Sequence, residues 1–531
     1  MRSKRVLIFA AMILSIAMII GGCSNKSSGS VSGDSAGSAS NGQKVLKIAY
    51  PDTITTLDVN NGSAATMLLE IAGVVQTLVA VDSDFVLHPS LATEWKRTGD
   101  TTWVFKLRQD VTFHDGTKFN AEAVKWCVNR SLEKNASFAQ TTGIKSVSVV
   151  DEFTVQFETT DKNGELPEAL TNVAAAIVAK SSVNEKGEFV QAIGTGYFKQ
   201  DSFDVSTGRF ECVPYDKYWE KVNSSVTRRV VLSMTDSSTR SLAAQNGEVD
   251  IASDVPFSDL QKLTGAKGVN VEKFNTARTY FFSYNLNKKY LQDINVRKAL
   301  IYAINKKELV NDVLLGVGSV PKGIYIDTMP WSNTNVDTYE FDVEKAKTLL
   351  KAAGYTDSDG DGYLDKDGKK FSIRIITGSR RPGNSLIVQA VQGYYKNIGV
   401  EAAVAVIDGN ASNEAIKNND YDLNLSSAAT GYIPSASYYL RTYYHSKSTN
   451  PKKINYSNPE LDKLIDECKA SSNAQEKYAL SKQAQAIAQA DAAVYTVANY
   501  GAVFVLSDKI KNFSYSAAVH DFVVPYATDL N

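Results

Sequence analysis

The order of elements between residues 371 and 407 limits the possible folds more than any other feature of this chain. Residues 371–376 and 401–407 are predicted strands, and residues 385–398 between them are predicted to form an amphipathic helix. A strand, a helix and a second strand in this order place both strands parallel in one sheet, because the helix carries the chain back across the sheet. The sequence therefore predicts a parallel α/β unit in the C-terminal half.

Strands and helices alternate irregularly in the rest of the chain. No repeat of fixed period occurs, which disfavours a solenoid or a propeller. A body as long as residues 45–531 is too large for one small core, so we expect two or three lobes. The other predicted strands are residues 45–50, 102–107, 154–158, 210–214, 229–232 and 280–286, and the other predicted helices are residues 67–77, 121–133, 236–246, 296–304, 308–314 and 343–353.

The N-terminus has the organisation of an export signal. Arg2, Lys4 and Arg5 give a basic start, and residues 6–20 form an apolar run. A helix needs about 20 apolar residues to cross the hydrocarbon core of a bilayer, and this run is shorter. A basic start, a short apolar run and small residues at its exit are typical of a secretory signal. We therefore expect residues 1–22 to be a signal peptide.

The exit from the apolar run, Ile20-Gly21-Gly22-Cys23, resembles the bacterial lipobox. The resemblance implies cleavage before Cys23, a diacylglyceryl group on its thiol, and a location on the outer face of the cytoplasmic membrane. Stable anchoring needs more than one acyl chain, since each buried methylene contributes only about 0.8 kcal/mol. Residues 23–44 are rich in Ser, Gly, Asn and Ala and cannot offset their ordering entropy by burial, so a disordered tether is predicted.

Composition argues against several classes of protein. The formal net charge is −1 and no long basic cluster occurs, so we expect no nucleic-acid partner. After Cys23 only Cys127, Cys212 and Cys468 remain, without a CxxC pair, which disfavours both a disulfide framework and a structural zinc site. No HExxH or P-loop motif is present, so we expect no enzymatic activity and no cofactor, and an exported hydrolase is the least favoured class.

Several segments carry a family resemblance through their order and spacing. The segments include LATEW at 91–95, TWVFKLR at 102–108, VTFHDG at 111–116, FNAEAV at 119–124, GTGYF at 194–198, GEVD at 247–250, VRKAL at 296–300, AKTLLKAAGY at 346–355 and SNPELD at 457–462. Each is weak alone, but the ordered set covers nearly all of residues 45–531 and resembles the bacterial extracellular solute-binding protein family 5, the peptide- and nickel-binding components of ABC importers.

The resemblance implies an α/β fold of the periplasmic-binding-protein type, with three lobes, mixed sheets and a ligand cleft between lobes. Lobe I is expected to comprise residues 45–76, 186–283 and 500–531, lobe II residues 77–185, and lobe III residues 284–499. A ligand that contacts two lobes favours their closed arrangement by its differential affinity. We expect a monomer that captures a small solute and delivers it to an ABC permease in the membrane.

The identity of the ligand is less constrained. Peptide-binding members commonly carry an Asp that pairs with the peptide ammonium, but the corresponding stretch here, residues 431–440, contains no acid, and a buried ammonium without a counter-charge is costly. The Arg and Trp positions of nickel-binding members fall near Phe138, Ala175 and Ala429, so those residues are missing. His445 matches their His position and is a candidate ligand residue, with an ordinary helix-end His as the alternative.

Two sets of residues are candidates for lining the ligand site. The first is the aromatic stretch after residue 431, whose rings offer apolar area and whose hydroxyls direct polar groups; packing at the start of a helix is the alternative. Its members are Tyr432, Tyr438, Tyr439, Arg441, Tyr443 and Tyr444. The second lies on the predicted strand 280–286 and consists of Tyr280, Phe282, Tyr284 and Asn285, with core packing as the alternative for every other member.

An acidic stretch resembles the early positions of an EF-hand calcium loop. Asp357, Asp359, Asp361 and Asp365 occupy ligand positions, and Gly362 lies at the sharp turn. The last position of the loop is Gly368 instead of the usual bidentate Glu. The sequence predicts weak calcium binding, with a metal-free acidic turn as the alternative.

The favoured hypothesis is the solute-binding lipoprotein of an ABC importer, with an oligopeptide or dipeptide as the ligand that the family resemblance suggests. A nickel or other metal chelate and an opine remain alternative ligands. A surface sensor or adhesin that uses the same fold is the alternative function.

Overall fold

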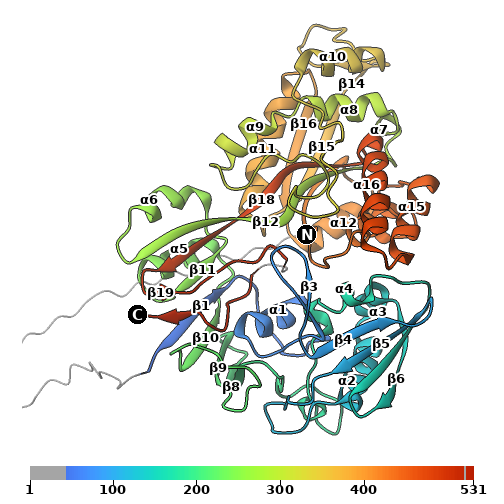
Figure 1. Cartoon of the computed structure of the whole chain (residues 1–531). Helices are drawn as coiled ribbons and strands as arrows, with labels where there is room; N and C mark the ends of the chain where they lie inside the picture. The colour runs from blue at the N-terminus through green and yellow to red at the C-terminus, as the bar shows by residue number, and fades with distance from the viewer. Residues whose placement is uncertain (1–42, 519–521) are drawn as a thin grey trace, which may run out of the picture. The chain divides into compact units, whose positions relative to one another are not determined.

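The fold is organised around a mixed ten-stranded sheet, described here from a computed structural model for residues 43–518 and 522–531 (Figure 1). The predicted signal peptide, Cys23 and the predicted tether up to residue 42 lie outside the described residues. The strand order is β16-β15-β17-β12-β18-β11-β1-β10-β9-β8. In that order the strands are Glu401–Ile407, Ser372–Gly378, Leu423–Ala429, Val269–Tyr284, Val494–Ser507, Ile251–Ser253, Val45–Tyr50, Arg228–Ser233, Arg209–Pro214 and Phe198–Asp204.

The parallel α/β unit predicted in the C-terminal half is confirmed. Strand β15 pairs with β16 in parallel register from Ser372 opposite Glu401 to Gly378 opposite Ile407, and helix α11 (Pro382–Lys396) connects them. Buried Ile387, Val388 and Val391 on α11 pack in the main hydrophobic core with this part of the sheet. The connecting helix enforces the parallel pairing, as the order of elements predicts.

Two long strands join the halves of the ten-stranded sheet. β12 and β18 pair antiparallel along most of their length, but the register shifts between Asn275 and Thr279 (Figure 1). The C-terminal part of β12 after this irregularity also pairs with β17. The C-terminal part of β18 pairs with β11. The shift therefore lies where the sheet passes from strands of the range predicted as lobe I to strands of the range predicted as lobe III.

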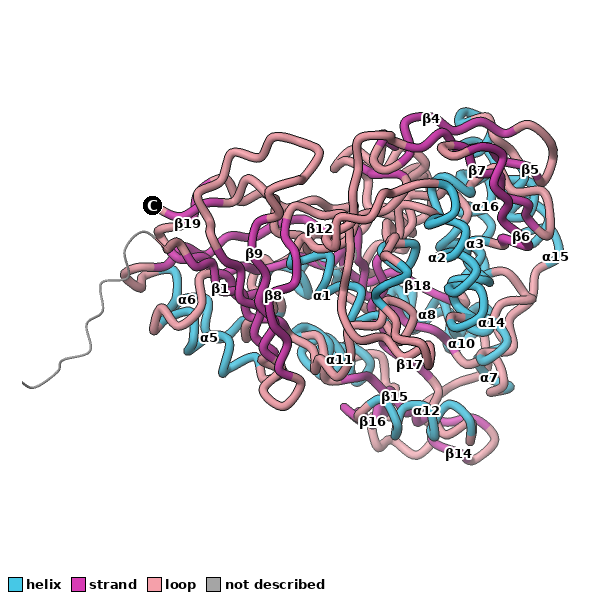
Figure 2. Tube along the Cα trace, turned by 90° about the horizontal axis from the view of Figure 1, so that it is seen from below, coloured by secondary structure: helices cyan, strands magenta, loops and turns pink. Residues whose placement is uncertain are grey.

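A separate four-stranded sheet lies within residues 77–185, the range predicted as lobe II. Its strand order is β4-β5-β7-β6, and helices α2 (Ala121–Lys134) and α3 (Ala136–Thr142) lie along it (Figure 2). Buried Trp103, Phe105 and Phe157 contribute apolar area to its core. The strands of this sheet are Ala92–Arg97, Thr102–Leu107, Thr154–Thr159 and Ile144–Asp151.

Two predicted helices differ from the structure. Helix α1 is Ser63–Ala72 and ends at Gly73, which adopts the left-handed conformation (φ 79°), so the predicted continuation to residue 77 is wrong. The helix predicted at 308–314 begins as α9 (Lys306–Glu308) and continues as a π-helical segment, Leu309–Val313. The other helices are α4 Leu166–Ala169, α5 Ser237–Gln245, α6 Leu260–Thr264, α7 Lys289–Gln292, α8 Ile294–Tyr302, α10 Val343–Ala352, α12 Gly409–Lys417, α13 Tyr438–Tyr444, α14 Thr449–Lys453, α15 Pro459–Ala470 and α16 Ala474–Asp491.

Gly194 and Gly196 lie where one loop passes directly over the backbone that follows α1. A Cβ atom on Gly194 would overlap the carbonyl oxygen of Val74, and one on Gly196 would overlap that of Gly73. A hydrogen bond from Gly196 N to Val74 O (3.0 Å) stabilises the close approach. A second bond, from His114 N to Gly194 O (3.0 Å), holds the same loop from another segment. Only glycine fits at these two positions without moving the backbone.

Residues 43–531 form one compact unit. Its first fixed contacts are made by Lys44, whose Nζ donates to Leu530 O (2.5 Å) and whose carbonyl accepts from Thr227 N (2.9 Å). The three cysteines at 127, 212 and 468 are buried and unpaired. Within the described residues, no helix combines the length and apolar character needed to cross a membrane.

Candidate functional site

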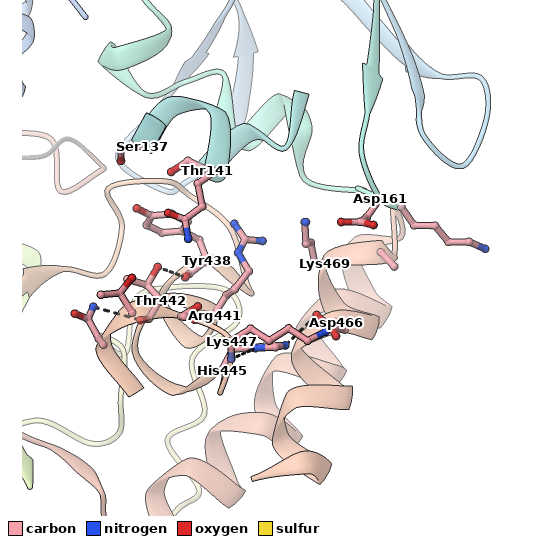
Figure 3. Close-up of a pocket in the computed structure, with 16 residues that line it drawn as sticks. Ser137, Thr141, Asp161, Tyr438, Arg441, Thr442, His445, Lys447, Asp466 and Lys469 are labelled. Atoms are coloured by element: carbon pink, nitrogen blue, oxygen red, sulfur yellow. Dashed lines mark hydrogen bonds and ion pairs between the residues drawn. The ribbon is translucent and has the colours of Figure 1, made fainter. Parts of the chain in front are cut away.

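A cavity of about 670 Å³ lies between the lobe II range and the lobe III range (Figure 3). Helix α3 and residues 161–162 line one side of it, and α13, the start of α14 and the end of α15 line the other. Its lining is mostly polar and includes Thr141, Tyr438, Arg441 and Lys469. A cavity bounded by two lobes is the arrangement in which a ligand can bridge both and favour closure.

The start of α13 is fixed by a carboxylate from the other side of the cavity. Glu165, which is 3% exposed, accepts hydrogen bonds from the backbone N–H of Ser437 (3.2 Å) and from its hydroxyl. The Ser435 hydroxyl accepts from the N–H groups of Ser437 (3.2 Å) and Tyr438 (3.0 Å). These bonds satisfy N–H groups that a helix start leaves without partners, and they set the direction in which Tyr438 and Arg441 point.

Direct contacts also hold the two lobe ranges together beside the cavity. Gly164 N donates to Lys469 O (2.7 Å), and the Arg97 side chain donates to Ala470 O (2.8 Å). Glu168 and Lys477 form a buried ion pair, with exposed fractions of 9% and 6%. Burial raises the pKa of Glu168, and the Lys477 charge opposes that rise. The described arrangement is therefore closed at this interface.

The predicted aromatic residues separate into two groups. Tyr438 lines the cavity and also lines an adjoining smaller one of about 150 Å³, where Tyr432 lies. Tyr439 and Tyr444 are each 1% exposed and pack in a hydrophobic core, so neither hydroxyl faces the cavity. Tyr443 also packs beside that core, with its ring 5.0 Å from the Phe281 ring. One face of α13 therefore contributes to the site and the other holds the helix in place.

His445 ends α13, and both of its ring nitrogens already have partners. The Lys447 backbone N–H donates to Nδ1 (3.1 Å), which leaves Nε2 as the donor toward Asp466 Oδ1 at 3.2 Å. The residue is 4% exposed, although it is part of the cavity lining. This geometry matches a helix-end residue that ties α13 to α15, and a metal ion would have to displace either the hydrogen bond at Nδ1 or the contact of Nε2 with Asp466.

Tyr284 and Asn285 lie away from these residues. Tyr284 is fully buried in the main core. The Asn285 side chain, also fully buried, donates to Asn419 Oδ1 (2.6 Å) and to Tyr421 O (2.8 Å). Neither residue lines the cavity, and their contacts match the core-packing alternative.

The acidic loop brings three of its four predicted ligands together. Carboxylate oxygens of Asp357, Asp359 and Asp361 lie within 4.8 Å of one another on exposed side chains. Asp361 pairs with the Lys370 ammonium at 2.5 Å. The Asp365 carboxylate instead accepts from the backbone N–H and the hydroxyl of Ser358 (2.8 and 2.7 Å). Calcium binding stays a prediction.

The chain resembles known proteins over most of its length. Residues 86–451 match the model of bacterial extracellular solute-binding proteins, family 5. The chain belongs to this family. The oligopeptide-binding protein AppA of Bacillus subtilis is 27% identical over 507 residues, covering 89% of both chains. The glutathione-binding protein GsiB of Salmonella typhimurium is 24% identical over 457 residues, covering 84% of this chain and 86% of the relative.

A solved structure extends the comparison to the fold. A nickel ABC transporter protein from Bacillus halodurans superposes with a TM-score of 0.75 and 28% identity, covering 92% of this chain and all of the other. The family fold expected from the sequence, α/β with mixed sheets, is thereby confirmed. Phe138 and Ala175, near which the resemblance places the Arg positions of nickel-binding members, are both buried.

Several residues of the site were not predicted from the sequence. Glu165, Glu168 and Lys477 carry no local pattern that indicates contact with residues hundreds of positions away. Lys469 stands in the last turn of α15, where a basic residue is ordinarily expected for the helix dipole. The stretch ELPEAL at 165–170, apolar except for its two acids, was the one available signal, because acids are rarely buried without a partner.

Proposed function

We propose that this chain is the substrate-binding lipoprotein of an ABC importer, anchored through Cys23 to the outer face of the cytoplasmic membrane. It captures an oligopeptide or dipeptide by closure of lobes II and III and delivers it to the permease as a monomer. The observation that carries this proposal is the 670 Å³ cavity lined from both lobe ranges, together with family membership. The names of the relatives support a peptide, since they are described as oligopeptide- and glutathione-binding proteins.

The proposal is tested by thermal unfolding of the compact unit, residues 43–531, with a library of peptides, metal chelates, opines and oligosaccharides. A ligand at a hundredfold excess over its dissociation constant adds about 2.7 kcal/mol to the free energy of unfolding, which gives a clear rise in melting temperature. A peptide that raises the melting temperature supports the proposal. Failure of every compound to do so contradicts a solute-binding role.

A nickel chelate is the second candidate ligand, favoured by the similarity to the nickel transporter protein from Bacillus halodurans. The occupied nitrogens of His445 weigh against a direct bond from this residue to the metal. The same library separates the two ligands, because a chelate with nickel would then raise the melting temperature where peptides do not. Localisation is tested by Cys23→Ala, which is expected to release the protein from the membrane fraction.

A further inference from the structure

Two basic side chains in the cavity have no counter-charge. Arg441 on α13 and Lys469 on α15 are both half-buried and line the cavity, and among the described residues neither side chain forms a hydrogen bond or an ion pair. Other basic residues at the same interface are paired: Lys477 with Glu168, and Lys162 with Asp100 at 2.6 Å. Lys447 also lines the cavity without such a partner among the described residues, but its side chain is exposed, whereas Arg441 and Lys469 are half-buried.

The two cations are close enough to disfavour each other. Burial and then the Arg441 charge lower the pKa of Lys469, and these effects outweigh the opposing effect of Asp161, Glu165 and Asp466. Figure 3 shows both charged ends pointing from their helices toward the segment that carries Thr141 and Asp161. Like charges directed into one partly desolvated space are unfavourable unless an anion lies between or beside them.

Nearby acids do not fill this role. Asp466 faces His445 Nε2 at 3.2 Å, and Glu165 accepts from Ser437. Asp161 lines the cavity but is exposed and is not within ion-pair distance of either cation. The cavity therefore holds two basic groups, neither of which forms an ion pair with a neighbouring carboxylate.

A purely structural role for Lys469 as a partner of the α3 C-terminus is also disfavoured. Its Nζ lies beside Gly143, the residue that ends α3. The last carbonyls of α3 already have donors, since Ala139 O accepts from Gly143 N (2.9 Å) and Thr142 O accepts from the Asn163 side chain (2.9 Å). The ammonium makes no hydrogen bond to them, so its three donors are available to a ligand.

We infer that Arg441 and Lys469 together bind an oxyanion of the captured solute, either a carboxylate or a phosphate. The inference rests on the proposed function and specifies that the site recognises the negatively charged group of the ligand. An Arg guanidinium binds a carboxylate or phosphate through a fork of donors, and a Lys ammonium adds a point charge. Neutral donors and acceptors surround the pair and can hold the rest of the ligand: Ser137, Gln140, Thr141, Thr442, Ser448 and Asn450.

Matched probes test the inference in titration calorimetry. The probes are a pool of tri- to pentapeptides with free C-terminal carboxylates, the same pool as C-terminal amides, and inorganic phosphate. The variants are Arg441→Gln and Lys469→Met, and Lys463→Gln is the control because this exposed residue of α15 pairs with Glu467 and lies outside the cavity. A charge-assisted hydrogen bond contributes about 1.5–3 kcal/mol, so the free acids should bind at least about tenfold more tightly than the amides.

That preference should vanish in Arg441→Gln and Lys469→Met and persist in Lys463→Gln. Phosphate binding alone, lost in both variants, supports the oxyanion site and contradicts a peptide ligand. Equal binding of acids and amides overturns the inference and leaves the peptide function intact. Binding of none of these anions to the wild type, or binding that both variants retain, overturns it as well.

A second measurement needs no ligand. Because Lys469 lies in surroundings that disfavour its charge, the ligand-free Lys469→Met protein should melt at the same temperature as the wild type or higher. A clear fall in that melting temperature indicates that Lys469 has a structural role and overturns the inference.

Discussion

The buried ion pair between Glu168 and Lys477 provides a direct test of interlobe closure. The change is Lys477→Met, which keeps an unbranched side chain but removes the charge that faces Glu168. Removing one partner of a buried pair typically costs about 3–5 kcal/mol, because the remaining charge stays desolvated. Opening of the lobes would return Glu168 to water, so this cost falls on the closed state alone. The ratio of closed to open molecules should therefore fall by about a hundredfold to a few thousandfold.

Two assays measure this change. Small-angle scattering of the ligand-free variant should give a larger radius of gyration than the wild type, and calorimetry should give a weaker apparent affinity for any ligand that needs closure. The matched control is Lys347→Met, whose partner Glu344 is exposed, with 3.4 Å between the charged atoms. A surface pair of this kind contributes at most about 1 kcal/mol. The double variant Glu168→Leu/Lys477→Met should recover most of the closed population, because an apolar pair leaves no buried charge.

The variant also has an expected pH dependence. Burial raises the pKa of Glu168 in the closed arrangement above its ordinary value of 4.5, and loss of the Lys477 charge raises it further. The closed state of Lys477→Met then binds a proton more tightly than the open state. The defect should be greatest at pH values above the raised pKa of Glu168 and should shrink as the pH falls through that pKa toward 4.5. Unchanged scattering and affinity at neutral pH would refute the assignment of this pair to interlobe closure.

Three further predictions concern stability and the acidic loop. Gly194→Ala should lower the free energy of unfolding by about 1–3 kcal/mol or more, because the new methyl overlaps the Val74 carbonyl. The control Gly393→Ala, on the open face of α11, should raise the free energy of unfolding by about 0.5–1 kcal/mol. Chemical denaturation measures both changes. Phe85→Ala should cost about 3 kcal/mol in the same assay, since the ring is 5% exposed and packs 5.7 Å from the Trp331 ring. Calcium titration should release or absorb heat with the wild type and not with Asp359→Asn, and absence of heat with the wild type removes the calcium site.

The sequence predicted the fold where local pattern decides it. Residues 371–407 carry their topology in their own order, because a helix between two strands leaves only one favourable pairing. The end of α1 was misplaced because the apolar residues continue past Gly73, and a glycine at a helix end can also be tolerated within a helix. Family segments extended the prediction to the whole body, which periodicity alone could not do.

The candidate site was predicted less completely, for a geometric reason. Tyr438 and Tyr439 are adjacent and chemically alike, yet a helix points neighbouring residues about 100° apart, so one lines the cavity and the other is buried. Choosing between them requires knowing which face of α13 meets the core. Glu165 reaches Ser437 across 272 positions of sequence, and no local spacing encodes such a contact.

The hydrogen bonds of Lys44 to Leu530 and Thr227 have a mechanical consequence. Any pull exerted by the preceding residues enters the body at β1, whose neighbours in the sheet are β10 and β11. That load passes into the lobe I range and does not run through α3, α13 or α15, which enclose the cavity. A membrane anchor at that end of the chain, as proposed, would therefore leave the two sides of the cavity free to move relative to each other.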